Sequence, residues 1–475
     1  MKLVWLRRDL RSIDNTALIE ALNSEERVVA AYIATPETWA EHNLAPIQAD
    51  LIYRRLFELR VQLQKLNVPL LYAEVGTFEQ SIAQLQEWSS RYGVAGICWN
   101  KEYEINESRR DKAVKRELSQ NGIDCTSFDD KCLLAPGAVL NKQNEYFKVF
   151  TPFKRAYLSK LSTTHWQVSK PSACVSADNF DDFEKDLLQE SSSFSYPRVS
   201  SSLYDIDDES ILAKLRLFER DDMDDYKKQR DFPSQDGTSG LSPYLAIGAL
   251  SVRQCFARLA FQQALPLSEG RETWQSELIW REFYQHLLHF EPKLSCGESF
   301  SEWGSYLIWS NETKYIEAWK NGLTGYPIVD AAMRQLNQTG WLHNRLRMIV
   351  ASFLVKDLLV DWRIGEAYFM NHLVDGDYAA NNGGWQWCAS TGCDGQPYFR
   401  IFNPITQGEK FDPTGVFVRR WIPELAEVPD KYVHQPWKWD SVKALSYPTP
   451  IVDHKVQREI TLANYKNAKD VFNAT

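Results

Sequence analysis

The run RVVAAYIA, at residues 27–34, is short, apolar and rich in residues that favour β-strands. Three similar runs occur in the first third of the chain: KLVWL at 2–6, PLLYAEV at 69–75 and VAGICWN at 94–100. Stretches with helical periodicity separate them, at Gln48–Leu66, Phe78–Tyr92 and Asn106–Gln120. This alternation predicts a doubly wound parallel sheet with helices on both faces. No GxGxxG motif follows the first run, so the usual dinucleotide fingerprint is absent.

The rest of the chain has a different organisation. From Ser162 to Asp225 the periodicity is lost and serine and acidic residues dominate, which predicts a solvated connector that only short helices interrupt. From Tyr226 onward the pattern is helical, most clearly at 272–290 and 343–359. We therefore predict three segments: an α/β domain at 1–133, a connector at 134–225 and an all-helical domain at 226–475.

Composition limits the classes of function. The net charge of −9 argues mildly against a general nucleic-acid coat protein, although a local basic surface is compatible with it. The eight cysteines form no CxxC pair, which predicts free thiols in a reducing compartment and no metal site. No run approaches the roughly 18 apolar residues of a membrane span, and the start MKLVWLRRDLR lacks the apolar stretch of a signal peptide. We expect a cytoplasmic protein without a membrane partner.

The run DGDYAANNGGWQW, from Asp375 to Trp387, is unlike an ordinary core segment. Its carboxylates and amides suit a polyhydroxylated or heterocyclic ligand, and its glycines allow a flat group to approach the backbone. Its tryptophans are suited to stacking on bases or to passing electrons between aromatic rings. Of the 17 tryptophans, those from Trp274 onward are the majority, so the second half of the chain has a distinct role. The segment indicates a ligand with an aromatic ring system.

Two predicted helices carry unusual faces. Around residue 280, three- and four-residue spacing places these residues on one face: Trp274, Glu277, Trp280, Arg281 and Tyr284. Such a face suits a ligand pocket, and the alternative is an amphipathic surface helix with an internal Glu277–Arg281 pair. The second helix places Asn344, Arg347 and Met348 together, and the alternative there is a helix that merely packs through Met348 and Leu346.

A turn-rich loop precedes these helices. It supplies the hydroxyl groups of Thr238, Ser239 and Ser242, which together with exposed N–H groups are suited to cradling phosphate. By itself this is a weak signal, because Ser/Gly loops are common. Arg230, Arg345 and Arg400 offer cations for a DNA backbone.

Several long motifs, in this order, resemble the photolyase/cryptochrome flavoproteins: LVWLRRDLR, SELIWREFYQHL, TGYPIVDAAMRQLNQTGWLHNRLRM, DGDYAANNGGWQW and PYFRIFNPITQGEKFD. The resemblance covers nearly the whole chain and is strongest to bacterial-type class I cyclobutane pyrimidine dimer photolyases. It implies a Rossmann-like antenna domain, a long connector and a helical FAD domain, in agreement with the organisation above.

The resemblance also implies roles for individual residues. The FAD ligands would be Tyr226, Thr238, Ser239, Gly240, Leu241, Ser242, Trp274, Glu277, Arg281, Asn344, Arg347, Asp375, Gly376, Asp377 and Asn381, with Asn381 against flavin N5. The lesion pocket would be lined by Glu277, Trp280, Asn344, Met348 and Trp387, and the phosphates of the DNA would be met by Arg230, Arg345 and Arg400. Trp385, Trp362 and Trp309 match an electron relay from flavin to surface, although without the family each is better explained as core.

A second chromophore is implied for the antenna domain. His42, Asn106 and Glu107 match positions that hold 5,10-methenyltetrahydrofolate in relatives. Where those relatives place a lysine against the folate tail, this chain has Cys296 or Gly297, so we expect a low affinity for the folate.

The implied activity is light-dependent DNA repair by a monomeric deoxyribodipyrimidine photo-lyase. Reduced FAD, excited by blue or near-ultraviolet light, donates an electron to a flipped-out cyclobutane pyrimidine dimer and splits it into two pyrimidines. Protonated Glu277 would stabilise the dimer, and Trp280 and Trp387 would stack on it. The alternative is a cryptochrome-type blue-light receptor without repair, which Asn381 and the lack of a long tail after Thr475 disfavour. A non-catalytic nucleic-acid binder would leave the flavin residues unexplained.

Overall fold

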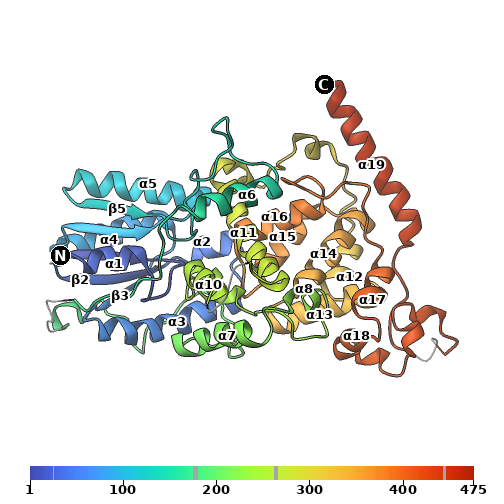
Figure 1. Cartoon of the computed structure of the whole chain (residues 1–475), viewed down its shortest axis with the longest axis horizontal. Coiled ribbons are helices and arrows are strands. Elements are labelled where there is room, and N and C mark those ends of the chain that lie inside the picture. Colours follow the sequence, from blue (N-terminus) through green and yellow to red (C-terminus); the bar gives the residue numbers. More distant parts are fainter. Residues whose placement is uncertain (25, 175–179, 262–265, 442–444) are drawn as a thin grey trace. The chain divides into compact units, whose positions relative to one another are not determined.

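The computed structural model describes residues 1–24, 26–174, 180–261, 266–441 and 445–475 (Figure 1). The chain forms two compact units. The first unit comprises Met1–Met223, Ser239–Pro292 and Val374–Asp377, and the second comprises Asp224–Thr238, Lys293–Leu373 and Tyr378–Thr475. The boundaries of these two units differ from those of the three segments predicted from the sequence. The three segments therefore stay a prediction.

The first unit contains a five-stranded sheet in the order β3-β2-β1-β4-β5. Its strands are all parallel: β1 (Lys2–Leu6), β2 (Val28–Ala34), β3 (Leu70–Glu74), β4 (Gly96–Asn100) and β5 (Asp124–Phe128). Val4 of β1 faces Ala30 on one side and Cys98 on the other. The predicted doubly wound sheet is confirmed. Strand β5 was missed, because its sequence DCTSF is polar and only Cys125 is buried.

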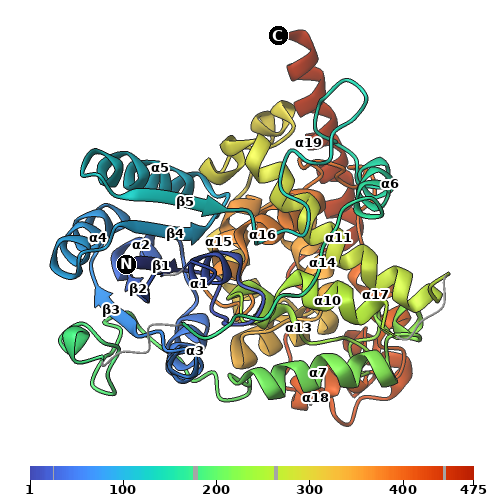
Figure 2. The same ribbon diagram turned by 60° about the vertical axis from the view of Figure 1, so that its left-hand side comes forward.

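Helices cover both faces of this sheet (Figure 2). Leu85 and Trp88 of α4 (Phe78–Tyr92), with Val114 and Leu118 of α5 (Ile105–Gln120), share a core with Leu3, Trp5 and neighbouring strand residues. On the other face lie α1 (Thr16–Leu22) and α3 (Pro46–Lys65), and α2 (Pro36–Glu41) follows β2. The order of the strands reverses between β1 and β4, the point where ligands of open α/β sheets commonly bind.

The helical part of the first unit is formed by α6 (Phe150–Leu161), α7 (Asp208–Asp221), α9 (Ser242–Ala246), α10 (Val252–Leu259) and α11 (Glu269–Phe290). Helix α7 has 14 residues and lies where the sequence predicted a connector with short helices. Its buried side chains, Ile211, Leu215 and Phe218, recur at helical spacing among acidic residues that mask the pattern. Asp207 caps the helix by accepting a hydrogen bond from Ser210 N at 2.8 Å, and this bond lowers the pKa of Asp207.

Among its described residues the second unit has helices and connecting loops and no β-strand, in agreement with the predicted helical domain. Its helices are α8 (Tyr226–Gln229), α12 (Thr313–Lys320), α13 (Pro327–Thr339), α14 (Asn344–Ser352), α15 (Trp362–Met370), α16 (Tyr378–Cys388), α17 (Pro404–Phe411), α18 (Val416–Trp421) and α19 (His454–Ala474). One large apolar core joins α13 to α18.

The predicted helix at 343–359 is not uniform. After α14 the chain forms a π-helical turn, η4 (Phe353–Asp357), and then Leu359 adopts a left-handed conformation with φ 51°. π-helical turns and bulky residues at positive φ both depart from ordinary helix, and both concentrate at sites with a function. Among the described residues, every helix is too short or too polar to span a lipid bilayer.

Candidate functional site

Helix α11 carries four of the predicted site residues within one continuous helix of 22 residues: Trp274, Glu277, Trp280 and Arg281. Trp274 is buried, with its ring 5.4 Å from that of Phe218 on α7. The other three side chains are half-buried. The face is therefore partly accessible, and the helix fixes the spacing of these residues.

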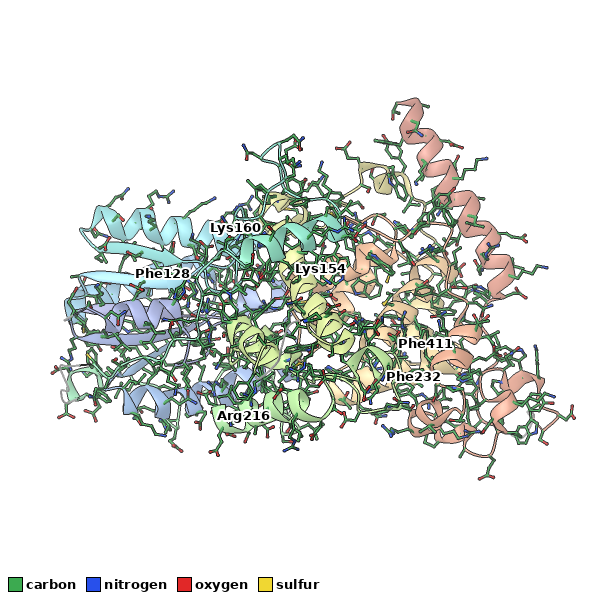
Figure 3. All side chains as sticks on the ribbon, viewed as in Figure 1. Phe128, Lys154, Lys160, Arg216, Phe232 and Phe411 are labelled. Carbon is green, nitrogen blue, oxygen red and sulfur yellow. The ribbon has the colours of Figure 1, made fainter. Side chains whose placement is uncertain are left out.

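The indole ring of Trp280 is held by a residue that the sequence did not single out. Phe150, at the start of α6, stacks on it with ring centroids 3.6 Å apart and an interplanar angle of 7°. Four residues later, Lys154 donates a hydrogen bond from Nζ to Ser276 Oγ on α11 at 2.6 Å (Figure 3 labels Lys154). Helix α6 thus sets the plane of Trp280.

The serine-rich loop meets the acidic run 375–377. Ser242, the first residue of α9, donates a hydrogen bond to Asp375 Oδ2 at 2.6 Å. Leu241 is buried and Ser239 is half-buried. Between them, Gly240 has φ 59°, a conformation in which a residue with Cβ is strained. The fold therefore brings two of the predicted flavin ligands, Ser242 and Asp375, into contact.

The next two residues are anchored in the same unit. The carbonyl oxygen of Gly376 accepts hydrogen bonds from Gln48 Nε2 at 3.0 Å and Arg8 Nη1 at 3.2 Å. Asp377 accepts from Gln285 Nε2 at 3.0 and 3.1 Å, and its Oδ2 lies 3.6 Å from Lys131 Nζ. These bonds hold the segment 374–377 in the first unit.

Lys131 links Asp377 to another predicted ligand, because its carbonyl oxygen accepts a hydrogen bond from Arg281 Nη1 at 2.9 Å. Burial acts to lower the pKa of Lys131, but the carboxylates of Glu104 and Asp377 raise it above its ordinary value. Lys131 is therefore a buried cation beside the predicted ligands.

In the second unit, Asn381 is oriented by α15. Its Nδ2 donates to the carbonyl oxygen of Glu366 at 3.0 Å, and the neighbouring Asn382 donates to Glu366 Oε1 at 2.7 Å. Burial raises the pKa of Glu366 to about 7. Because the amide nitrogen of Asn381 is engaged, its orientation is set by the main chain of α15.

Helix α14 begins with the predicted ligands. His343 caps it by accepting a hydrogen bond from Arg345 N at its Nδ1, 3.2 Å away, which is a structural role. Asn344 is exposed, and Arg347 donates from Nε to Leu342 O at 2.8 Å. Met348 is half-buried against the core.

Arg345 is held by two partners. Its Nη2 and Nε donate to Asp231 Oδ1 at 2.8 and 3.2 Å, and its guanidinium lies 4.5 Å from the ring centroid of Phe411. Phe232 packs edge-on against Phe411, with ring centroids 6.4 Å apart; Figure 3 labels both side chains. The guanidinium of Arg230 lies 5.3 Å from the ring of Tyr226, which is buried. Thr238 is half-buried, and Arg400 is exposed on the segment after α16.

The predicted relay residues differ in burial. Trp385 and Trp362 are buried in the core of the second unit, and Trp309 packs against that core while half-buried. A Cβ on Gly365 would lie 2.1 Å from Trp385 Cη2, so glycine is required there. Trp319, which was not predicted, lies 6.1 Å from Trp385. Trp387 is half-buried against the same core.

The three predicted antenna residues lie together on the segments that follow β2 and β4. His42, directly after α2, is 3.0 Å from Asn106 Nδ2 through its Nε2 and 3.4 Å from Glu107 Oε1 through its Nδ1. Burial acts to raise the pKa of Glu107, but the hydrogen bond with His42 holds it below its ordinary value. Cys296 and Gly297 belong to the second unit.

Comparison with known proteins agrees with this geometry. Residues 2–174 match the family model "DNA photolyase", and residues 274–467 match "FAD binding domain of DNA photolyase". The chain is 56% identical to the deoxyribodipyrimidine photo-lyase of Vibrio cholerae, over 99% of this chain and 100% of that protein. It is 49% identical to that of Escherichia coli, over 98% of each.

The chain belongs to the DNA photolyase family. Among solved structures, a class III photolyase from Agrobacterium tumefaciens matches this photolyase fold with a TM-score of 0.82 and 34% identity, covering 99% of this chain and 98% of that one. The helical part of the chain is thus an FAD-binding domain of the photolyase type, as the sequence predicted.

Several polar residues of the first unit are suited to binding FAD, the cofactor named by the matching family model. Gln285 Oε1 is buried without a hydrogen-bond partner among the described residues, beside Asp377. Such an acceptor suits the hydroxyl groups of a polyhydroxylated ligand. Ser242, Asp375 and the cation Lys131 add a hydroxyl, a carboxylate and a charge for phosphate.

Sequence reasoning missed five residues that contact the predicted site residues within their own units: Lys131, Phe150, Asp231, Gln285 and Glu366. Each contacts a predicted residue that belongs to another element, at least 15 residues away in the chain. Gln285 carried a local signal, since it stands four residues after Arg281 on the same helix. The other four carried none.

Proposed function

We propose that this protein repairs cyclobutane pyrimidine dimers in DNA in a light-dependent reaction, as a deoxyribodipyrimidine photo-lyase. The observation that carries the proposal is helix α11, which presents Trp274 and Arg281 for the flavin and Glu277 and Trp280 for the lesion from one rigid element. FAD, when bound, supplies the absorption of light and the electron-transfer chemistry.

In the proposed reaction, side chains of the protein bind the DNA lesion and orient it. Trp280, with its plane set by Phe150, offers an aromatic surface for a flipped-out pyrimidine, and stacking of this kind contributes about 1–3 kcal/mol per base. Glu277 stands one turn before it and would hydrogen-bond a pyrimidine carbonyl group. Asn344, Met348 and Trp387 complete the proposed set for the lesion.

For FAD, we infer the ligands Tyr226, Thr238, Ser239, Gly240, Leu241, Ser242, Trp274, Glu277, Arg281, Asn344, Arg347, Asp375, Gly376, Asp377 and Asn381. The contact between Ser242 and Asp375 supports the assignment at the phosphate and ribose end. The bond from Asn381 to α15 supports a fixed amide at the flavin ring. Trp385, Trp362 and Trp309 are proposed to carry electrons that restore the reduced flavin.

For DNA, we infer contacts from Arg230, Arg345 and Arg400 to phosphates. The protein is proposed to act as a cytoplasmic monomer. For the antenna, we infer that His42, Asn106 and Glu107 bind 5,10-methenyltetrahydrofolate, which their mutual contacts support. An absorption spectrum of the purified protein tests this inference, because bound folate adds a near-ultraviolet band that His42→Ala should remove.

The decisive experiment is illumination of the chemically reduced protein with an oligonucleotide that carries one defined cyclobutane thymine dimer. We expect conversion to two thymines in blue light and none in the dark. Glu277→Gln should lower the yield per absorbed photon, and Glu272→Gln, on the exposed first turn of α11, should not. Flavin binding without any conversion in light would favour the photoreceptor alternative.

A further inference from the structure

Lys356 is a buried cation in the second unit, with 0% of its surface exposed. It lies in the π-helical turn η4, and its Nζ donates hydrogen bonds to Ser390 Oγ and to the carbonyl oxygen of Arg400, both at 3.0 Å. Neither acceptor is a carboxylate. A buried ammonium group with only neutral acceptors is costly, so an ordinary core position would not retain it.

Among the residues that the structure describes, Lys356 forms no ion pair. The neighbouring carboxylate of Asp357 pairs instead with His454 of α19. Burial lowers the pKa of Lys356 to about 8, while Cys388 and Asp357 act in the opposite direction. At pH 7 the side chain is therefore mainly ammonium, and its two bonds are charge-assisted.

The two hydrogen bonds of Lys356 hold both ends of the segment from Ser390 to Arg400. Ser390 follows α16 in a left-handed conformation with φ 61°, and Ala389 before it accepts a hydrogen bond from Tyr465 OH at 2.9 Å. At the far end, Arg400 N donates to Pro397 O at 2.9 Å, which closes a turn. Phe399 in this turn is 57% exposed, and the side chain of Arg400 is exposed as well.

We propose that Lys356 is a positioning residue for DNA binding: its ammonium group fixes the main chain of Arg400, so that the exposed turn 397–400 is held ready to meet a DNA backbone. The inference rests on the proposed function, in which Arg400 contacts a phosphate. The strained backbone at Ser390, one end of the segment, and at Leu359, just after η4, agrees with it, because positive φ at such residues persists only where the surroundings enforce it.

The test compares Lys356→Met, Arg400→Ala and the double variant in binding to a duplex with one thymine dimer, over a range of salt concentrations. Methionine keeps an unbranched apolar stem of four heavy atoms but removes the ammonium group. We expect Lys356→Met and Arg400→Ala each to weaken binding by about five- to tenfold and to reduce the slope of log K against log salt by about one. The double variant should bind no more weakly than Arg400→Ala, because both changes remove the same contact.

A purely structural lysine would give a different result. Lys356→Met would then lower the unfolding midpoint without changing the salt slope, or its effect would multiply with that of Arg400→Ala, and either outcome overturns the proposal. Lys320→Met, a half-exposed lysine of α12 paired with Glu317, is the matched control and should bind as the wild type does.

If Lys356→Met does not fold, Ser390→Ala removes one of its two acceptors and leaves the cation. It should weaken binding by about threefold, again without adding to Arg400→Ala; binding like that of the wild type would overturn the proposal. Failure of the wild-type protein to bind or repair the dimer would refute the proposed function itself. Normal repair with unaltered binding in Arg400→Ala would refute only the role of the turn, and with it that of Lys356.

Discussion

Trp385 is packed on several sides by aromatic rings of the second unit. Phe369 lies 5.0 Å away edge-on, Trp319 lies 6.1 Å away, and Gly365 leaves no space for a larger residue. We expect Trp385→Phe to block light-driven reduction of oxidised FAD, because phenylalanine is far harder to oxidise than tryptophan. Repair by chemically pre-reduced protein should survive. The measurement is the flavin absorbance during illumination with a reductant.

Trp319→Phe is the control for this prediction. Trp319 is equally buried and adjacent, but it lies outside the proposed relay, and its Nε1 donates to Val350 O at 3.0 Å. Photoreduction should persist in it. Normal photoreduction in Trp385→Phe, or its loss in Trp319→Phe, would show that electrons take another route.

Glu366 gives a pH-dependent prediction. Its folded pKa, about 7, lies above the ordinary value of 4.5, so the folded protein holds a proton that the unfolded chain releases. The stabilisation associated with this proton is therefore present below pH 4.5 and is lost as the pH rises to 7. In Glu366→Gln, Oε1 still accepts from Asn382, and no carboxylate has to be buried.

We expect Glu366→Gln to match the wild type at pH 5 and to exceed it at pH 8 by up to about 3 kcal/mol in free energy of unfolding, since one pKa unit corresponds to about 1.4 kcal/mol. Urea unfolding of the FAD-bound protein at the two pH values measures this. Flavin absorbance should be unchanged, because Asn381 binds the main chain of Glu366. A constant difference between pH 5 and pH 8 would contradict the assigned titration.

The ion pair of Arg345 with Asp231 joins α14 to the turn after α8. Because Asp231 and Phe411 restrict the guanidinium, little side-chain entropy remains to be lost when it meets a phosphate. If about three to five phosphates are neutralised, log K should fall with log salt at a slope near −3 to −4. Arg345→Ala should reduce that slope by about one unit.

A matched control for this slope is Arg334→Ala. Arg334 of α13 pairs with Glu424 at 2.9 Å and takes no part in the proposed DNA contacts. Its removal should leave the slope unchanged. Salt-independent binding by the wild type would count against the whole set of Arg230, Arg345 and Arg400.

Some helices and strands could be predicted from the sequence, and others could not. The strands β1 to β4 and the helices α4 and α11 were predicted within a few residues, because each has a clear period and an apolar face. Strand β5 and helix α7 were not, since the first is polar and the second lies among acidic residues. The π-helical turn at Lys356 has an ordinary helical sequence, and only its packing reveals the buried charge.

For the candidate site, spacing along one helix predicts which residues share a face, and contacts between distant segments lie beyond the reach of the sequence. Residues three or four apart on α11 and α14 share a face by geometry, so their grouping follows from spacing. Contacts such as Phe150 with Trp280, or Asn381 with the main chain of Glu366, join distant segments and depend on tertiary packing alone. Individual roles rested on the family resemblance.

The residues that α14 offers determine which DNA lesion we expect the protein to repair. A (6–4) photoproduct requires a proton transfer that a cyclobutane dimer does not, and a pair of histidines would suit it. Here α14 offers Asn344 and Met348, and His343 is committed to capping the helix with its Nδ1. Burial also lowers the pKa of His343 to about 4, so it is neutral at pH 7.

We therefore expect the reduced protein to repair cyclobutane dimers and to leave (6–4) products unchanged. The measurement is product analysis after illumination of an oligonucleotide that carries either lesion at one position. Conversion of the (6–4) lesion alone would overturn the proposed lesion residues.

The short segment Val374–Asp377 has a consequence for synthesis in the cell. It belongs to the first unit, although the chain has by then passed through Lys293–Leu373 of the second. On the ribosome, the first unit therefore stays incomplete after Pro292 has been made, until Asp377 emerges. At about 5–20 residues per second, that interval lasts roughly 4 to 17 seconds. During it, the partners of Ser242, Gln285 and Gln48 are missing, so a nascent chain stalled in this window is a natural target for chaperones and proteases.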